Sequence, residues 1–263
     1  MDPDIVEHYS LGIEEDRLTE GETSRIEFAR TKELLERFLP PAPAKVLDVG
    51  GGPGRYASWL AELGYEVDMI DPVPLHLEQA AERSRTGVSF TTTAGDARDL
   101  AVGDSAYDAV LMLGPLYHLP DRADRVRALS EARRVVKPGG PVIIALISRF
   151  ASLLDGLRSG TLSDPSVRPY IQRVLETGVN ANPGKRPEYF TTAYFHHPDE
   201  IEGECEDAGL RCETVLGIEG LGWLTWEKWD DPEGRENILR VARALEDEPT
   251  VKGASTHLLA VAR

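Results

Sequence analysis

Short apolar runs alternate with amphipathic stretches along most of this chain. Each apolar run is too short for a typical helix, which is typical of a buried strand, and the first is partly β-branched. Such runs lie at 44–49, 65–70, 88–93, 107–113 and 141–147. Between them, apolar residues at helical spacing predict helices at 54–63, 74–85 and 121–136. This alternation predicts βαβ units, a mainly parallel sheet and right-handed crossovers.

Further elements are expected on both sides of this alternation. Residues 1–20 look irregular apart from one short helix, and an amphipathic helix is expected over 24–39. Thr23 or Ser24 can cap that helix, and Glu27 stands three residues after Ser24, as in a capping box. Towards the end of the chain the pattern returns with one helix and two strands, at 198–208, 210–217 and 256–262.

Two long blocks interrupt the pattern, at 148–197 and 218–254. The first lacks an expected strand and consists of helical segments joined by polar loops, at 150–158 and 166–177. Blocks of this length inside a compact α/β domain often cover a ligand. We therefore expect one domain over 1–263, in which the two inserts and the N-terminal segment 1–43 form a helical cap.

The composition narrows the classes of partner. The chain has 263 residues, with 29 Lys and Arg against 45 Asp and Glu, and a formal charge of −16. A chain this acidic repels a phosphate backbone, which disfavours DNA or RNA as a substrate. The first residues are acidic where a signal peptide is basic, and the longest apolar runs are too short to cross a bilayer. We therefore expect a cytoplasmic protein with no nucleic acid and no membrane as its partner.

The two cysteines indicate the same compartment. Cys205 and Cys212 lie at a spacing that fits no zinc pattern, and two thiols make no disulfide framework. We expect both thiols to be reduced and structural, as in a cytosolic protein. The sequence predicts no metal site.

A glycine-rich turn follows the first strand directly. Val49 ends the strand, Gly50, Gly51 and Gly52 follow, and helical spacing begins near Tyr56. Consecutive glycines continue neither a strand nor a helix cheaply, so the chain turns here. A glycine turn between a strand and a helix brings bare backbone N–H groups close to a ligand. A nucleotide-like cofactor is the first hypothesis.

The glycines allow two different assignments. The run from Gly52 to Ala57 fits the G-x-G-x-x-A pattern of nicotinamide and flavin enzymes, among them the NAD(P)-dependent oxidoreductases. The other assignment is Asp48-x-Gly50-x-Gly52-x-Gly54. Because Gly50 is the first turn residue, a dinucleotide enzyme needs its third glycine at position 55, where Arg55 stands. Asp48 would also repel a pyrophosphate; it suits a cationic ligand, or it anchors the turn by accepting backbone N–H bonds.

Two further acids follow the next two strands. Asp71 ends the second strand, before Pro72, where a carboxylate can bind both ribose hydroxyls of an adenosine. Asp96 lies between Gly95 and Ala97 at the same edge of the predicted sheet. Its side chain can accept the adenine amino group while the Ala97 N–H meets a ring nitrogen. The alternative for both acids is an ordinary turn or cap residue.

These motifs together resemble those of the class I S-adenosylmethionine-dependent methyltransferases. The resemblance covers residues 45–147 and includes the closing strand. Within that superfamily the chain is most similar to small-molecule enzymes of bacterial metabolism, including those that tailor natural products. The stretches that carry the resemblance are Asp48–Gly54, Asp71, Gly95–Ala97, Tyr107–Val110 and Lys137–Gly140.

The resemblance implies a Rossmann-like α/β fold with a seven-stranded, mostly parallel sheet, an antiparallel last strand and helices on both faces. It also implies that the glycine turn packs against the methionine part of S-adenosylmethionine and that Tyr9 and Arg17 fold over the cofactor. Leu113 and Gly114 would then lie near the reacting methyl group. The cofactor-binding residues expected on this basis are Tyr9, Asp48, Gly50, Gly51, Gly52, Asp71, Pro72, Gly95, Asp96, Ala97, Leu113 and Gly114.

Two histidines are candidates for catalysis. Methyl transfer is an in-line displacement that gains most from positioning, but an oxygen or nitrogen nucleophile usually must also lose a proton. His118 follows the fourth strand and can take that proton; the alternative is a histidine that packs in its loop. His196 is the second candidate. Tyr117, Phe195 and Trp223 are expected to line an apolar substrate pocket.

We therefore expect a methyltransferase that acts on an oxygen or nitrogen of a small molecule, with carbon also open as the acceptor. Two alternatives stand beside it: an NAD(P)-dependent oxidoreductase, and a catalytically silent protein that binds S-adenosylmethionine. The sequence assigns no substrate, and a monomer and a homodimer both fit it.

Overall fold

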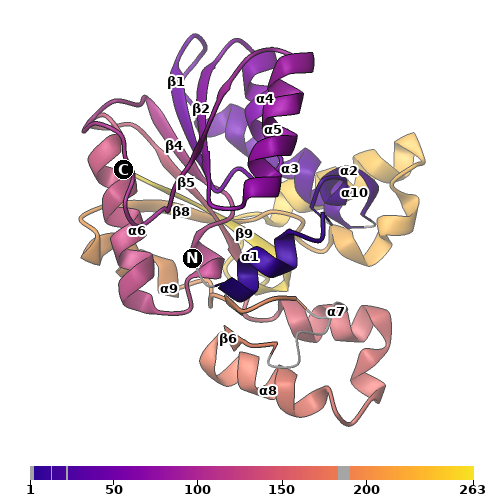
Figure 1. Cartoon of the computed structure of the whole chain (residues 1–263). Coiled ribbons are helices and arrows are strands. Elements are labelled where there is room, and N and C mark those ends of the chain that lie inside the picture. Colours follow the sequence, from indigo (N-terminus) through magenta and orange to yellow (C-terminus); the bar gives the residue numbers. More distant parts are fainter. Residues whose placement is uncertain (1–2, 13, 22, 183–189) are drawn as a thin grey trace.

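The computed structural model describes residues 3–12, 14–21, 23–182 and 190–263. Its centre is a seven-stranded sheet with the order β3-β2-β1-β4-β5-β9-β8 (Figure 1). The strands are β1 (Lys45–Val49), β2 (Glu66–Asp71), β3 (Thr91–Ala94), β4 (Ala109–Met112), β5 (Val142–Ile147), β8 (Cys212–Gly217) and β9 (His257–Ala262).

Only one strand of the sheet runs against the others. β9 pairs antiparallel with both β5 and β8, while the pairs among β1 to β5 are parallel. The expected seven-stranded sheet with an antiparallel last strand is therefore confirmed. Because the parallel strands end at one edge, the residues after β1, β2, β3 and β4 come together there.

Helices cover both faces of the sheet (Figure 1). One face is covered by α3 (Ser24–Phe38), α4 (Arg55–Glu62) and α5 (Pro74–Thr86), and the other by α6 (Arg122–Val135) and α9 (Glu200–Asp207). The inward residues of each strand alternate between the two cores: Leu47 and Val49 face the α6 side, whereas Val46 faces the α4 side. Strands buried on both faces explain the nearly continuous apolar runs in the sequence.

The remaining segments lie at the carboxyl ends of the parallel strands or beside them (Figure 1). In the N-terminal segment the structure has two short helices, α1 (Pro3–Tyr9) and α2 (Arg17–Glu20), where one was expected. The inserts contain α7 (Ala151–Ser159), α8 (Arg168–Thr177) and α10 (Pro232–Leu245). Short 3-10 helices complete the inserts: η2 (Thr161–Ser163), η3 (Gly222–Lys228) and η4 (Lys252–Ala254). Another, η1 (Leu116–His118), follows β4. None of the helices described is long and apolar enough to cross a bilayer.

Two local expectations were wrong. The block 148–197 does contain strands, because β6 (Val179–Asn180) and β7 (Ala193–Tyr194) form a small antiparallel pair. Two-residue strands carry too little periodicity to be seen in a sequence. The capping box at Ser24 is also absent: of the two expected caps Thr23 takes the cap position, and the Glu27 carboxylate instead binds the guanidinium of Arg17.

The second insert is attached to α3 through a buried arginine. The Arg30 side chain is fully buried and donates to the carboxylates of Glu33 and Glu246 and to the carbonyl of Ile218. Glu246 also accepts from Arg37. These bonds hold the segment after β8 against the helix that precedes β1.

Candidate functional site

The glycine turn after β1 has a backbone that requires glycine. Gly50, Gly52 and Gly54 have φ angles of 72°, 58° and 79°, a region that side chains disfavour. Between them, a Cβ atom on Gly51 would lie 2.7 Å from Oδ2 of Asp48. The three glycines with positive φ are the glycines of the pattern Asp48-x-Gly50-x-Gly52-x-Gly54, which supports that assignment. Arg55, at the third position of the dinucleotide pattern, instead donates to the Glu15 carbonyl.

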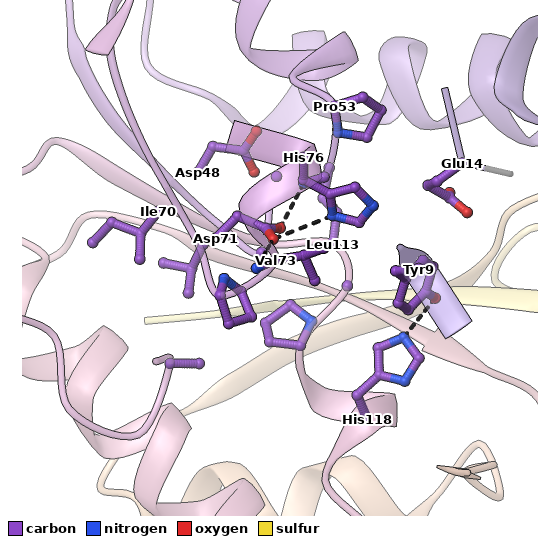
Figure 2. Close-up of a pocket in the computed structure, with 18 of the residues that line it drawn as sticks. Tyr9, Glu14, Asp48, Pro53, Ile70, Asp71, Val73, His76, Leu113 and His118 are labelled. Carbon is purple, nitrogen blue, oxygen red and sulfur yellow. Dashed lines mark hydrogen bonds and ion pairs between the residues drawn. The ribbon is translucent and has the colours of Figure 1, made fainter. Parts of the chain in front are cut away.

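Asp71 joins the end of β2 to that turn. Its Oδ2 accepts the Gly52 N–H at 2.9 Å, and its Oδ1 accepts the Val73 N–H at 2.8 Å (Figure 2). His76, in the first turn of α5, places Nδ1 3.2 Å from Oδ1. Since a carboxylate oxygen accepts about two hydrogen bonds, Oδ2 retains room for a ligand hydroxyl. Asp71 thus fixes the turn and also lines the cavity above it.

Asp48 is a buried carboxyl group with no hydrogen-bond partner in the part of the chain that the structure describes. The proposal that it anchors the turn through backbone N–H bonds is therefore wrong for the described residues. Burial, and then the charge of Asp71, raises its pKa to about 7. An orphaned carboxyl group beside a cavity is costly unless a ligand offers a donor or a positive charge. It therefore fits the expected ligand, a cofactor with cationic groups.

The cavity at this edge of the sheet, of about 960 Å³ including its open mouth, lies above the glycine turn. All twelve residues expected to bind the cofactor line it. Arg17, expected to fold over the cofactor with Tyr9, lines it too, and the structure adds residues that were not expected there, among them Glu14 and His76. His76 could have been predicted from the sequence, because it stands five positions after Asp71, at the start of a helix.

Asp96 and Ala97, which follow β3, also line this cavity. Hydrogen bonds from the Arg98 side chain, at 2.9 and 2.7 Å, hold the pKa of the Asp96 carboxyl well below its ordinary range. The backbone N–H of Arg98 donates to the same carboxylate. Asp96 is therefore an ionised acceptor in a fixed orientation.

His118 lies in η1, at the end of the loop after β4, and lines the same cavity. Its Nε2 is 2.8 Å from the hydroxyl of Tyr9 in α1 (Figure 2). Burial lowers the pKa of His118 to about 4, so the ring is neutral at physiological pH. The bond holds α1 over the cavity.

A second, larger cavity adjoins the first. It holds about 1430 Å³ including its open mouth, and the two cavities share Tyr9, Glu14, Arg17, Tyr56, Leu113 and Tyr117 as lining residues. One wall is apolar and comes from β5, the 148–197 block and its helices; it includes Ile147, Val167, Ile171, Phe190 and Phe195. Tyr117 and Phe195, both expected to contact substrate, therefore lie on this second cavity. His118 does not belong to its lining.

Another part of the lining, the charged wall, contains Arg17, Glu27 and His257, and sequence reasoning missed it as a substrate wall. Arg17 donates to Glu27 at 2.8 Å and to Glu14 at 2.5 Å. His257, at the start of β9, bonds through Nδ1 to the buried carboxylate of Glu219. Burial alone would lower the pKa of His257, but the charges of Glu27 and Glu219 raise it to about 9.

Two expected site residues lie elsewhere. His196 is fully buried, with Nε2 3.3 Å from Glu204, and it lines neither cavity. Glu204 also pairs with Arg125 at 2.7 Å, so His196 belongs to a buried ionic cluster between α6 and α9. Trp223 donates its Nε1–H to the Ala254 carbonyl at 2.9 Å and likewise lines neither cavity. The prediction that His196 is catalytic and the prediction that Trp223 binds substrate are therefore wrong. Each side chain has a packing role, which depends on partners far away in the sequence.

The family model described as "Methyltransferase domain" matches residues 46–140. Among curated proteins, the chain is 30% identical over 192 residues to "Ubiquinone biosynthesis O-methyltransferase" of Xanthomonas axonopodis pv. citri, covering 71% of this chain and 70% of that protein. The protein of the same description from Leptothrix cholodnii is 31% identical over 208 residues, covering 76% of this chain and 77% of the relative.

The fold also matches solved structures. An S-adenosylmethionine-dependent methyltransferase from Mesorhizobium loti aligns with a TM-score of 0.60 at 17% sequence identity. The alignment covers 90% of this chain and 99% of that one. At this identity the likeness concerns the fold alone.

Proposed function

The chain belongs to the class I S-adenosylmethionine-dependent methyltransferases, and we propose that it methylates a hydroxyl oxygen of a small molecule. The relatives that are 30 and 31% identical to it over the aligned residues are described as O-methyltransferases, which favours oxygen over nitrogen or carbon. S-adenosylmethionine is the cofactor. The alternative of an NAD(P)-dependent oxidoreductase is not favoured. The similarity to methyltransferase enzymes also favours an active enzyme over a protein that only binds S-adenosylmethionine.

The observation that carries the cofactor assignment is the unpartnered Asp48. When bound, the cofactor supplies an electrophilic methyl group on a sulfonium sulfur. Asp48 would compensate the positive charge of the methionine part, and Asp71 would accept the ribose hydroxyls on the side away from Gly52. Asp96, held ionised by Arg98, would accept the adenine amino group beside the Ala97 N–H. These residues bind and orient; none forms a covalent bond.

The second cavity is proposed to hold the acceptor molecule. It meets the cofactor cavity at Leu113 and Tyr117, which line both. The wall with Phe195 suits an apolar or aromatic body, and the wall with Arg17 and His257 suits a polar group. The N-terminal segment 1–43 and the inserts 148–197 and 218–254 would exclude water from this space and select the substrate.

His118 was predicted as the base that removes the substrate proton. Its place in the first cavity and its bond to Tyr9 instead support a role in holding α1 over the cofactor. A pKa of about 4 would also make it a weak base for a hydroxyl group.

Ligand-dependent thermal unfolding followed by a turnover assay tests the proposal. S-adenosylmethionine and S-adenosylhomocysteine should each raise the melting temperature, because a ligand that binds only the folded state stabilises it by mass action. NADH should leave it unchanged. Incubation with S-adenosylmethionine and a panel of phenols and catechols should then release S-adenosylhomocysteine. Stabilisation by NADH alone, or release only with amines, would contradict the proposed reaction.

A further inference from the structure

The charged wall of the second cavity contains a histidine whose two ring nitrogens have different surroundings. His257 is the first residue of β9, and its side chain is 27% exposed, towards the cavity that it lines. Nδ1 bonds to Oε1 of Glu219. Nε2 has no hydrogen-bond partner among the described residues. The ring thus turns one nitrogen to a carboxylate and leaves the other free.

Glu219 holds that ring in one orientation. Its carboxylate is 1% exposed, and Oε2 accepts the Ser255 hydroxyl at 2.9 Å and the His257 N–H at 3.0 Å. Because an ionised carboxylate only accepts hydrogen bonds, the proton between the two side chains belongs to Nδ1 of His257. Nε2 is consequently the nitrogen that gains or loses a proton. A carboxylate–imidazole pair in this arrangement is the usual way to orient a base and stabilise its imidazolium.

We propose that His257, positioned by Glu219, is the general base that takes the proton from the hydroxyl group of the acceptor; this inference rests on the proposed function. The hydroxyl proton passes to Nε2, and an electron pair of the oxygen forms the new bond to the methyl carbon. The electrons of the broken carbon–sulfur bond remain on the sulfur, whose positive charge they neutralise. The proton on Nε2 then leaves to solvent. His257 is thus the catalytic residue and Glu219 the positioning residue.

The charged groups around His257 suit this task. Glu219, in the loop after β8, and Glu27 of α3 face the ring, while Arg17 of α2 neutralises Glu27. The two acids raise the pKa of His257 to about 9. A phenol has a pKa of about 10 in water, so proton transfer between the two groups is nearly balanced. The neutral ring becomes abundant only near pH 9, and turnover should rise with pH towards that value.

The same three side chains could be taken for a metal site. The ligand atoms of Glu27, Glu219 and His257 all lie within 4.8 Å of one another. However, both oxygens of Glu27 already accept hydrogen bonds from Arg17, and Nδ1 of His257 is bonded to Glu219. A cation would have to displace the guanidinium, so the arrangement favours proton transfer.

A measurement without turnover separates this inference from the proposed function. 4-Nitrophenol is added to the enzyme with S-adenosylhomocysteine, below the pH at which the free phenol ionises in water. The wild type should hold it as the yellow phenolate beside the His257 imidazolium, and His257→Gln should remove this absorbance. His197→Gln is the matched control, since His197 lies beside His196 and lines neither cavity. Absence of the phenolate band in the wild type, or its persistence in His257→Gln, would overturn the inference.

Turnover with the best phenol of the panel gives the second readout. In the wild type, kcat/KM should rise about tenfold per pH unit between pH 6 and 8. His257→Gln should lower kcat at least 100-fold, and Glu219→Gln should move the pH profile to lower pH with a smaller loss. Affinity for S-adenosylmethionine should stay unchanged in both variants, which also checks their folding. A flat profile, full activity of His257→Gln, or loss of activity on chelation that Mg²⁺ restores would each overturn the assignment.

Discussion

The hydroxyl of Tyr9 lies 2.8 Å from Nε2 of His118, and this bond joins α1 to the segment after β4 across 109 residues of chain. The Tyr9 ring also packs edge-on against His76, 5.2 Å away between ring centroids. One phenol therefore connects the N-terminal helix with two segments that line the cofactor cavity.

Removing this hydroxyl should loosen α1. In Tyr9→Phe the ring contacts remain, but the buried Nε2 of His118 loses its partner, at a cost of about 1–2 kcal/mol. Amide hydrogen exchange in α1 should become roughly 5–30 times faster at constant pH, while exchange in the central strands stays the same. Ser10→Ala is the control, because it removes an exposed hydrogen bond at the end of the same helix. Equal protection of α1 in both variants would mean that the Tyr9 bond does not hold the helix.

Replacement of Asp71 should weaken cofactor binding. In Asp71→Ala, the ribose hydroxyls would lose their acceptor, and the N–H groups of Gly52 and Val73 would lose theirs. We expect the affinity for S-adenosylmethionine to fall by about 1–3 kcal/mol, measured by calorimetry. Asp99→Ala removes another acid near the same edge and should leave the affinity unchanged. An unaltered affinity in Asp71→Ala would reduce Asp71 to a turn residue.

The cofactor cavity could be predicted from the sequence because its residues follow a simple rule. In a parallel sheet the strand ends gather at one edge, so Asp48, Asp71 and Asp96 meet wherever each strand ends within a residue or two. Each of these acids stands next to a recognisable local sequence pattern, a strand end or a glycine turn. The twelve predicted residues accordingly line one cavity.

The substrate wall could not be found in the same way. Arg17, Glu27 and His257 line the cavity, and Glu219 lies behind His257. These four residues come from distant segments, and only tertiary packing brings them together. Glu27 looked like a capping residue because Ser24 stands three positions before it. His196 looked accessible because no sequence pattern reveals that Glu204, eight positions later, pairs with both His196 and Arg125.

The ionic cluster that contains His196 should be structural. The guanidinium of Arg125 donates to the Glu204 carboxylate and to the carbonyls of Leu119 and Pro120. Its replacement in Arg125→Met leaves the Glu204 carboxylate buried beside a neutral neighbour, so we expect a loss of about 3–5 kcal/mol in the free energy of unfolding, measured in urea.

A matched control lies one turn earlier on α6. Arg122 pairs with Asp207 of α9 at 2.6 Å, but both side chains are more than half exposed. Arg122→Met should therefore cost less than about 1 kcal/mol, because water and salt screen an exposed pair. Similar losses in the two variants would mean that the buried cluster contributes no more than a surface pair.

The pH dependence of stability should reveal Asp48 before any ligand is added. The pKa of Asp48 is raised from 3.8 to about 7 by burial and by Asp71. Between these two values the folded protein keeps a proton that the unfolded chain releases, so this group makes the free energy of unfolding fall as pH rises. The protonated Asp48 thus contributes a few kcal/mol to the free energy of unfolding at low pH, and this contribution is lost by about pH 7. Asp48→Asn, which stays neutral, should therefore be more stable than the wild type at pH 8, with a smaller difference at pH 5.

Cofactor binding should also depend on the ionisation of Asp48, but the affinity should rise with pH, whereas the stability contribution of this group falls. A positive charge beside Asp48 favours the carboxylate, so binding at pH 6 must first remove a proton. We expect the affinity of the wild type for S-adenosylmethionine to rise about tenfold from pH 6 to pH 8, and calorimetry in buffers of different ionisation enthalpy to detect released protons at pH 6. Asp48→Asn should bind more weakly at pH 8, with an affinity that depends little on pH. A wild-type affinity that is flat over this range would show that no positive charge of the cofactor lies against Asp48, although the carboxyl group lines its cavity.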